Sequence, residues 1–333
     1  MPNTVRIWYV AAQRLCNFHC RYCVSVSDYA KSNTEEWSAP DDRARMERIV
    51  RWIGDLPFRV GVRLATVGEP FASRAFLAQA TWLSKRPNID FVELLTNGSL
   101  LKRRLEQLRS DGDLSKISLW ITHHHTEISI ARLIENARLA QDEYGCFVVV
   151  NGLIFPDNAA SVDELRHAAE EAGLRFNLDL GYDPLTPHAA HSTIDRMVPV
   201  LRAGGDDGIS RAVQLGADPE LLELNLLAMR DLRNQPCAAG HNYLYIGMHG
   251  DVYRCSRYQA LGKDQLGNVL DDDFELKLNE ERWVTCAAGF GCGNKEDFLN
   301  LQRWSRRATS SARSLGWVGG SPSRPQSPPS PSR

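Results

Sequence analysis

Six short apolar runs alternate with amphipathic stretches between about residues 5 and 184. In the stretches between the runs, apolar side chains recur at helical spacing. This alternation predicts repeated strand–helix units, which assemble into a parallel sheet. The predicted strands span residues 5–11, 60–67, 91–97, 117–122, 147–155 and 175–181.

Six units are too few for a closed eight-stranded barrel, so the sequence predicts an α/β fold built as an open (βα)6 partial TIM barrel. In βα barrels the functional site lies at the C-terminal ends of the strands. The first three strands are followed by a cysteine-rich loop, by "GEP" and by "TNG". Ser38 and Ser161 are the predicted N-caps of two of the helices, and Gly173 is the predicted end of the second.

The pattern changes after Pro184, which predicts a second region. A helical stretch is followed by a hairpin that turns at "HG", and four cysteines are spread over this region. We predict a barrel over residues 1–200, a small C-terminal domain over 201–310 and a Pro/Ser-rich, disordered tail over 311–333.

Composition excludes several classes of protein. The chain has 333 residues, of which 43% are hydrophobic and 24% charged, as in globular proteins with a sizeable core. A formal net charge of −2 gives no electrostatic footprint for nucleic acid. No apolar run reaches the roughly 20 residues of a membrane span, and the N-terminus lacks a signal-peptide pattern. We expect a cytoplasmic protein that binds neither nucleic acid nor membrane, with reduced thiols.

Three cysteines, Cys16, Cys20 and Cys23, fall within eight residues after the first predicted strand. A structural zinc site takes four ligands, and a disulfide framework takes an even number of cysteines. A [4Fe–4S] cluster normally takes four thiolates, so three leave one iron open to a substrate or cofactor. Structural zinc and free thiols are the alternatives.

The spacing C-x3-C-x2-C resembles that of the radical S-adenosylmethionine (radical SAM) superfamily, and the resemblance covers about residues 5–300. It implies that S-adenosylmethionine binds the open iron of a [4Fe–4S] cluster and is split to a 5′-deoxyadenosyl radical. This radical abstracts hydrogen from a substrate. The resemblance also implies an external electron donor of the flavodoxin or ferredoxin type.

The same resemblance assigns cofactor contacts. Tyr22 fills the aromatic position before the last cysteine, which usually lies against the adenine. Gly68 and Glu69 stand where the family binds the amino group of the methionine moiety, although Val67 replaces the first glycine of that segment. Asn97 lies where related members often place a cofactor or substrate contact.

The C-terminal cysteines extend the resemblance. Cys237, Gly250 and Cys255 follow the C…G-x4-C pattern of SPASM and twitch domains, which hold auxiliary iron–sulfur clusters. With Cys286 and Cys292 they resemble the shorter twitch form, which implies a second [4Fe–4S] cluster with four protein ligands. A zinc knuckle with the same four thiolates is the alternative.

Four further residues are candidates for the site. Asn151, in the fifth predicted strand, is a further predicted cofactor contact. His124, after the fourth strand, and Asp179, at the end of the sixth, are candidate catalytic groups, because each lies at the active end of the barrel. Cys146 precedes the fifth strand at the opposite end, where a buried inert thiol is the default and a catalytic role the alternative.

The resemblance implies an enzyme that oxidises a carbinol carbon of a small polyhydroxylated molecule, such as a sugar or an aminocyclitol of antibiotic biosynthesis. The auxiliary cluster would accept the electron left after hydrogen abstraction. A radical epimerase with a cysteine as hydrogen donor and a ribosomal-peptide maturase are the enzymatic alternatives. A silent iron–sulfur scaffold or a zinc-binding interaction module is the non-enzymatic one.

Overall fold

The computed structural model describes residues 4–20, 22–23, 34–155, 157–181, 210–228, 231–289, 291–304 and 313–314. All six predicted barrel strands are present, each within two residues of its predicted bounds. They are β1 (Val5–Ala11), β2 (Val60–Thr66), β3 (Ile89–Thr96), β4 (Ile117–Thr122), β5 (Phe147–Ile154) and β6 (Arg175–Leu180). Each pairs in parallel with the next along the chain, which confirms the predicted partial barrel.

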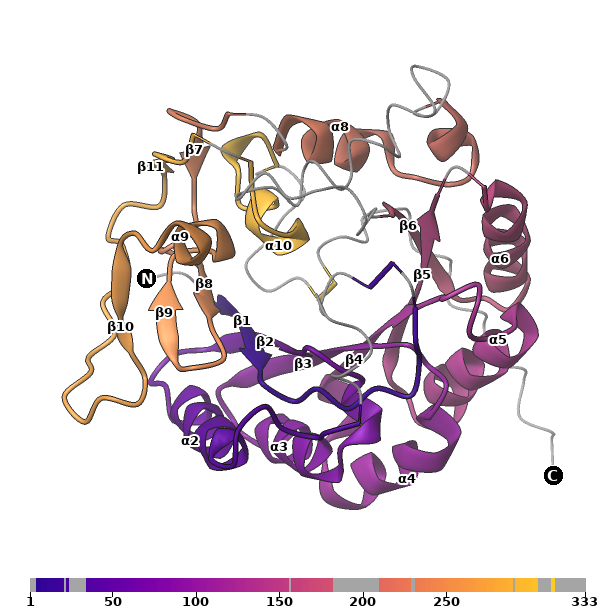
Figure 1. The fold of residues 1–333 in the computed structure, drawn as a ribbon, viewed down its shortest axis with the longest axis horizontal. Helices are drawn as coiled ribbons and strands as arrows, with labels where there is room; N and C mark the ends of the chain where they lie inside the picture. Colours follow the sequence, from indigo (N-terminus) through magenta and orange to yellow (C-terminus); the bar gives the residue numbers. More distant parts are fainter. Residues whose placement is uncertain are drawn as a thin grey trace, which may run out of the picture.

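Helices cover the outer face of this curved sheet (Figure 1). They are α2 (Asp42–Gly54), α3 (Arg74–Ser84), α4 (Leu101–Asp111), α5 (Ile130–Arg138) and α6 (Ala159–Glu171). The chain also has short helical turns at Pro70–Ala72, Leu114–Lys116, Leu139–Glu143 and Gln302–Trp304. Strand residues such as Ile7 and Val62 pack against apolar helix residues such as Ile49 in one buried core. The opposite face of each strand therefore points into the barrel.

Two predicted helix starts are wrong. α2 begins at Asp42 with Asp41 as N-cap, and the Ser38 hydroxyl donates to the Ala12 carbonyl instead. α6 begins at Ala159, so Ser161 lies inside its first turn. The predicted end of α6 is confirmed, because Gly173 follows the helix with φ of 67°.

The C-terminal region continues the barrel sheet. β8 (Tyr243–Ile246) pairs in parallel with β1, and β9 (Asp251–Tyr253) and β10 (Gln265–Asn268) add antiparallel strands beyond it. The predicted hairpin is therefore β8–β9, and Gly250 has the positive φ of 88° that its turn requires. The region also contains α8 (Pro219–Ala228), β7 (Pro236–Cys237), α9 (Ser256–Leu261), β11 (Val284–Thr285) and α10 (Lys295–Phe298).

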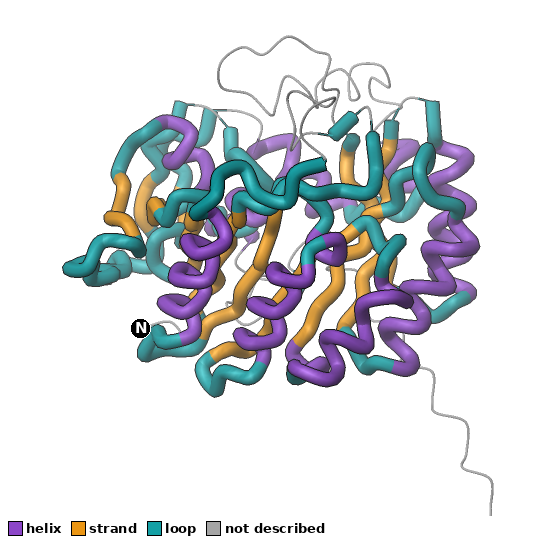
Figure 2. Tube along the Cα trace, turned by 60° about the horizontal axis from the view of Figure 1, so that its bottom comes forward, coloured by secondary structure: helices purple, strands orange, loops and turns teal. Residues whose placement is uncertain are grey.

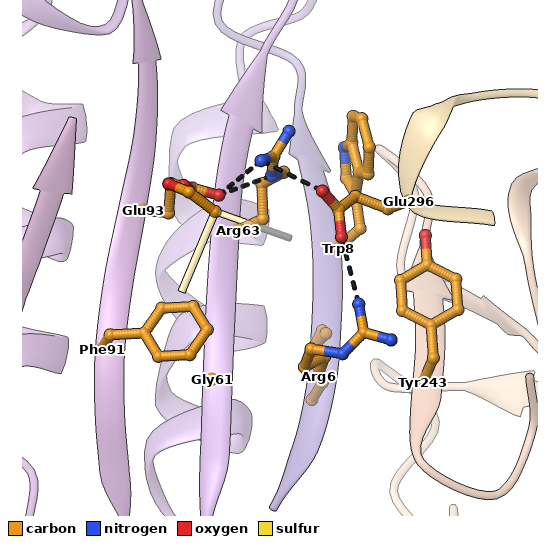
Figure 3. A pocket seen from close by; sticks show the side chains of 10 residues that line it. Arg6, Trp8, Gly61, Arg63, Phe91, Glu93, Tyr243 and Glu296 are labelled. Atoms are coloured by element: carbon orange, nitrogen blue, oxygen red, sulfur yellow. Dashed lines mark hydrogen bonds and ion pairs between the residues drawn. The ribbon is translucent and has the colours of Figure 1, made fainter. Parts of the chain in front are cut away.

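Helix α10 lies inside the curve of the strands (Figure 1) and carries Glu296 into a buried layer of charges. Arg63 on β2 pairs with Glu93 on β3, at 2.8 Å from Nε to Oε2, and with Glu296 at 3.0 Å (Figure 3). Arg6 on β1 pairs with Glu296 at 3.0 Å. All four side chains are at most 7% exposed. The layer joins the barrel interior to the C-terminal region.

The described chain reaches into the predicted tail. Ser314 is buried and its hydroxyl donates to Glu93, while Arg313 donates to the Ser115 carbonyl at 2.8 Å. Residues 315–333, which hold most of the predicted disordered segment, lie outside the described residues.

Candidate functional site

The three cysteines after β1 share one electrostatic environment. Cys20 is buried, whereas Cys16 and Cys23 are half-buried. Burial, the Glu69 carboxylate and Cys23 together raise the pKa of the Cys16 thiol to about 11. Burial, Glu127 and the other two thiols raise the pKa of Cys20. The three thiols belong to one loop after β1 and perturb one another's titration, and bound iron would stabilise their thiolate forms.

The "GEP" loop after β2 is hydrogen-bonded to the chain just before the cysteines. The amide of Gly68 donates to the Gln13 carbonyl at 3.0 Å, and the amide of Glu69 donates to the Leu15 carbonyl at 2.9 Å. A Cβ at position 68 would lie 2.4 Å from the Leu15 carbonyl oxygen. Glycine is therefore required sterically where these two loops cross. The two loops meet at the carboxyl ends of their strands, as predicted.

Glu69 is a buried carboxylate that accepts three hydrogen bonds within the described chain. Its Oε1 accepts from the Phe71 amide at 3.0 Å and from the Thr96 hydroxyl at 2.7 Å, and its Oε2 accepts from the Asn97 amide at 2.7 Å. Burial nevertheless raises its pKa to about 7, against the effect of these three hydrogen bonds. Oε2 can accept a second hydrogen bond beside the one from Asn97. A buried carboxylate is also stabilised by a nearby positive charge, so both features favour a cationic ligand such as an ammonium group.

Asn97 connects the loop after β3 to the cysteine loop. Its Nδ2 donates to Asn17 Oδ1 at 3.1 Å, and its Oδ1 accepts from the amide and the hydroxyl of Ser99. Asn17 Nδ2 in turn donates to the Ser99 hydroxyl at 2.8 Å. The side chain of Asn97 is thus bonded to Asn17, the residue that directly follows Cys16. Both the nitrogen and the oxygen of the Asn97 side-chain amide are used in holding these loops together.

Tyr22 and the histidines after β4 form an aromatic group at the same end of the barrel. The Tyr22 ring is stacked on His124 and His125, with centroids 5.8 and 5.6 Å apart, and contacts Phe155 at 4.6 Å. Burial, and then the neighbouring histidines, lower the pKa of His124 to about 4. His124 is therefore neutral near pH 7, and its Nδ1 has no hydrogen-bond partner within the described chain.

Asn151 and Asp179 face the barrel interior from neighbouring strands. On β6, Leu178 and Leu180 belong to the apolar cluster that includes α6 residues. By alternation, Asn177 and Asp179 point the other way. Asn151 Oδ1 accepts from Asn177 Nδ2 at 2.7 Å, and Asp179 lies two residues nearer the carboxyl end of β6, opposite Leu153.

Cys146 lies at the other end of the barrel. It precedes β5, is 3% exposed, and belongs to the main apolar core. Burial raises the pKa of its thiol to about 12. A protonated thiol in this position fits the inert interpretation of this residue.

The four C-terminal cysteines line one cavity, together with apolar residues, Tyr258, Asp297 and the arginines Arg254 and Arg257. The cysteines are Cys237, Cys255, Cys286 and Cys292. Burial raises the pKa of the Cys292 thiol, and Asp297 and the other three thiols raise it further. No group of three or more His, Cys, Asp or Glu side chains in the described residues is placed to hold a single metal ion. In a cubane cluster each thiolate binds a different iron, so four thiols around one cavity fit that donor set.

Asp297 connects two of the loops that carry these cysteines. Its carboxylate accepts from the amide and hydroxyl of Ser256, which follows Cys255, at 3.2 and 2.6 Å. It also accepts from the amide of Gly293, which follows Cys292, at 3.2 Å. Because one buried side chain bonds to both loops, it fixes the separation of the two thiols.

If the four C-terminal thiols hold the predicted second cluster, replacing Asp297 by alanine is expected to remove its iron selectively. The substitution leaves buried amides without an acceptor and frees the two loops. Iron in reconstituted protein should fall from about eight toward about four atoms per chain, with the signal of the three-cysteine cluster retained in EPR spectra. Asp271→Ala, an exposed aspartate in the same region, is the matched control. Full iron content in Asp297→Ala would contradict this role.

Comparisons with known proteins bear on the fold of the chain. No protein-family model matches the chain. A stretch of 97 residues is 29% identical to GTP 3′,8-cyclase of Syntrophomonas wolfei, and it covers 29% of this chain and 28% of that enzyme. The match therefore spans under a third of that relative.

Two solved structures have a similar fold. Histidine-tagged anSMEcpe with bound AdoMet has a TM-score of 0.50 at 18% identity, covering 80% of this chain and 75% of that one. Native anSMEcpe with bound AdoMet has a TM-score of 0.50 at 16% identity, covering 90% and 82%. The partial-barrel fold is thereby confirmed. The radical SAM superfamily, the twitch domain and the particular family stay predictions.

Several residues of these sites were not predicted. Arg63 and Glu93 are charged residues inside predicted buried strands, which is unusual enough to have indicated an interior ion pair. Glu296 and Asp297 follow Cys292 closely, but no local pattern distinguishes them from solvent-exposed acidic residues.

In the described part of the chain, no helix is long and apolar enough to cross a bilayer.

Proposed function

We propose that this chain is a radical SAM enzyme that oxidises a carbinol carbon of a sugar- or aminocyclitol-like substrate to a ketone. The observation that carries the proposal is the pair of separate thiol groups. Three thiols lie in the loop that follows β1, where Cys16 is close enough to buried Glu69 to feel its charge, and four thiols line one cavity in the C-terminal region.

When loaded, the first cluster would supply a 5′-deoxyadenosyl radical from S-adenosylmethionine, and the second would accept one electron. In this oxidation the carbinol loses a hydrogen atom from carbon, a proton from oxygen and one electron, so that C–H and O–H bonds break and C=O forms. The chain must provide a base for the proton. Asp179 faces the barrel interior near the carboxyl end of β6, which suits that role. His124 is the weaker candidate, because its Nδ1 has no hydrogen-bond partner within the described chain but burial lowers its pKa to about 4.

The placement of the cysteines favours oxidation over inversion. Inversion of a carbinol centre requires a thiol that returns a hydrogen atom to the substrate. All eight cysteines lie in the described part of the chain. Three follow β1, four line the C-terminal cavity, and Cys146 lies at the opposite end of β5. No cysteine is left over at the carboxyl ends of the strands.

The test uses anaerobically reconstituted protein, dithionite and S-adenosylmethionine, with 5′-deoxyadenosine measured by chromatography. We expect 5′-deoxyadenosine from the wild type and none above background from the Cys16→Ala/Cys20→Ala/Cys23→Ala variant. With aminocyclitol and sugar substrates, the product should be two mass units lighter, and a deuterium on the reacting carbon should appear in 5′-deoxyadenosine.

Other outcomes separate the alternatives. A product of unchanged chemical formula that takes one deuterium from D2O would establish inversion. Turnover of peptides and not of carbinols would establish a peptide maturase. Absence of 5′-deoxyadenosine from cluster-loaded wild type would exclude radical SAM chemistry and leave the scaffold interpretation.

A further inference from the structure

A basic groove lies between the first turns of α4 and α5, which are neighbouring helices on the outside of the barrel (Figure 1). It is lined by Ser99, Lys102, Arg103, Arg132 and Glu135, among others. Lys102 is paired with Glu135 at 3.2 Å, and Arg103 and Arg132 are exposed. This local excess of positive charge contrasts with the net charge of −2 of the whole chain.

The positive charge extends beside the groove. Burial lowers the pKa of the Arg104 guanidinium, and the charges of Arg74 and Arg103 lower it further. Neither α4 nor α5 has a side-chain cap at its N-terminus or an acidic residue in its first turn. The positive ends of both helix dipoles therefore add to the field of the arginines.

The groove borders the cysteine loop. Ser99 lines it, and the Ser99 hydroxyl accepts a hydrogen bond from Asn17, the exposed residue that directly follows Cys16. Ser99 also bonds to Asn97, which lies against Glu69. A protein seated on the groove would thus contact the loop that is proposed to hold the first cluster.

We propose that this basic groove is the docking surface for an acidic one-electron carrier protein of the flavodoxin or ferredoxin class. The inference rests on the proposed function, which needs one electron delivered to the three-cysteine cluster. In each encounter the reduced carrier loses one electron and the cluster gains it, with no bond made or broken. Complementary charge steers such an encounter and orients the carrier toward the cysteine loop.

The test variant is Arg103→Glu/Arg132→Glu, which reverses two exposed charges at the N-terminal ends of α4 and α5. The matched control is Arg109→Glu/Arg138→Glu, which makes the same change in net charge at the C-terminal ends of the same helices. Reduced flavodoxin is the probe. Binding is measured by calorimetry over a series of salt concentrations, and 5′-deoxyadenosine formation is measured with flavodoxin and, separately, with dithionite.

We expect the groove variant to bind flavodoxin about tenfold more weakly or worse and to lose most of the salt dependence. Flavodoxin-driven turnover should fall in parallel, dithionite-driven turnover should stay within about twofold of wild type, and the control should match wild type in both. Equal flavodoxin affinity in both variants would overturn the proposal. So would displacement of flavodoxin from the wild type by an equimolar single-stranded RNA. If the wild type forms no 5′-deoxyadenosine with dithionite, the proposed function is refuted. The calorimetric comparison of the two variants would still show whether flavodoxin binds the basic groove.

Discussion

Anaerobically reconstituted protein is expected to contain about eight iron and about eight sulfide atoms per chain. The Cys16→Ala/Cys20→Ala/Cys23→Ala variant is expected to contain about four of each. The reason is that the two sets of thiols lie in separate places, three in the loop after β1 and four around the C-terminal cavity. Removing one set leaves the donors of the other in place.

The matched control for this experiment is Cys146→Ala, which removes a buried thiol that belongs to neither set. It should keep about eight iron atoms, even if the loss of core packing lowers its stability. About four iron atoms in the wild type and none in the triple variant, with zinc in both samples, would identify the C-terminal set as a structural zinc site. Oxidation through an auxiliary cluster would then be wrong.

The second large effect is expected from Arg63→Met, which removes the central cation of the buried charge layer. Arg63 pairs with both Glu93 and Glu296, and the substitution leaves Glu93 without its partner arginine and Glu296 with Arg6 alone (Figure 3). Breaking a buried ion pair on one side costs about 3–5 kcal/mol of unfolding free energy. In a chain of this size we expect the thermal midpoint of the apo-protein to fall by roughly 10 °C.

Two further variants test the cause of that loss. Arg63→Met/Glu93→Gln/Glu296→Gln removes the uncompensated charges as well, so it should recover part of the lost stability. Arg43→Met breaks an exposed pair with Glu47 at 3.1 Å and should cost under about 1 kcal/mol. An Arg63→Met midpoint equal to that of Arg43→Met would show that the interior pairs contribute little. Thermal unfolding followed by circular dichroism measures all three.

The charge layer also explains how the two regions are held together. Figure 2 shows the strands running through the middle of the molecule with helices against their outer side. Glu296 enters the inner side from α10, which starts three residues after Cys292. The ion pairs with Arg6 and Arg63 therefore position the segment that follows Cys292, one of the four C-terminal cysteines.

Strand positions could be predicted because buried parallel strands are short, continuously apolar runs, and that signal is local. Helix starts were harder to predict, since the capping residue depends on where the chain before the helix packs. The Ser38 hydroxyl bonds to the Ala12 carbonyl in a neighbouring segment and leaves α2 to begin four residues later.

The sequence by itself determined which residues are available for the sites. Three local features predicted a barrel with three thiols at the carboxyl ends of its strands. They are the spacing of Cys16, Cys20 and Cys23, the "GEP" segment and the alternation of strands and helices. Only the tertiary structure decided which distant residues serve these thiols. β8 lies beside β1, Glu296 meets Arg63, and Asp297 joins the loops of Cys255 and Cys292. These contacts bring together segments that are far apart in the sequence, and they form only when the sheet curves around α10. No local sequence pattern encodes which buried charge will face another.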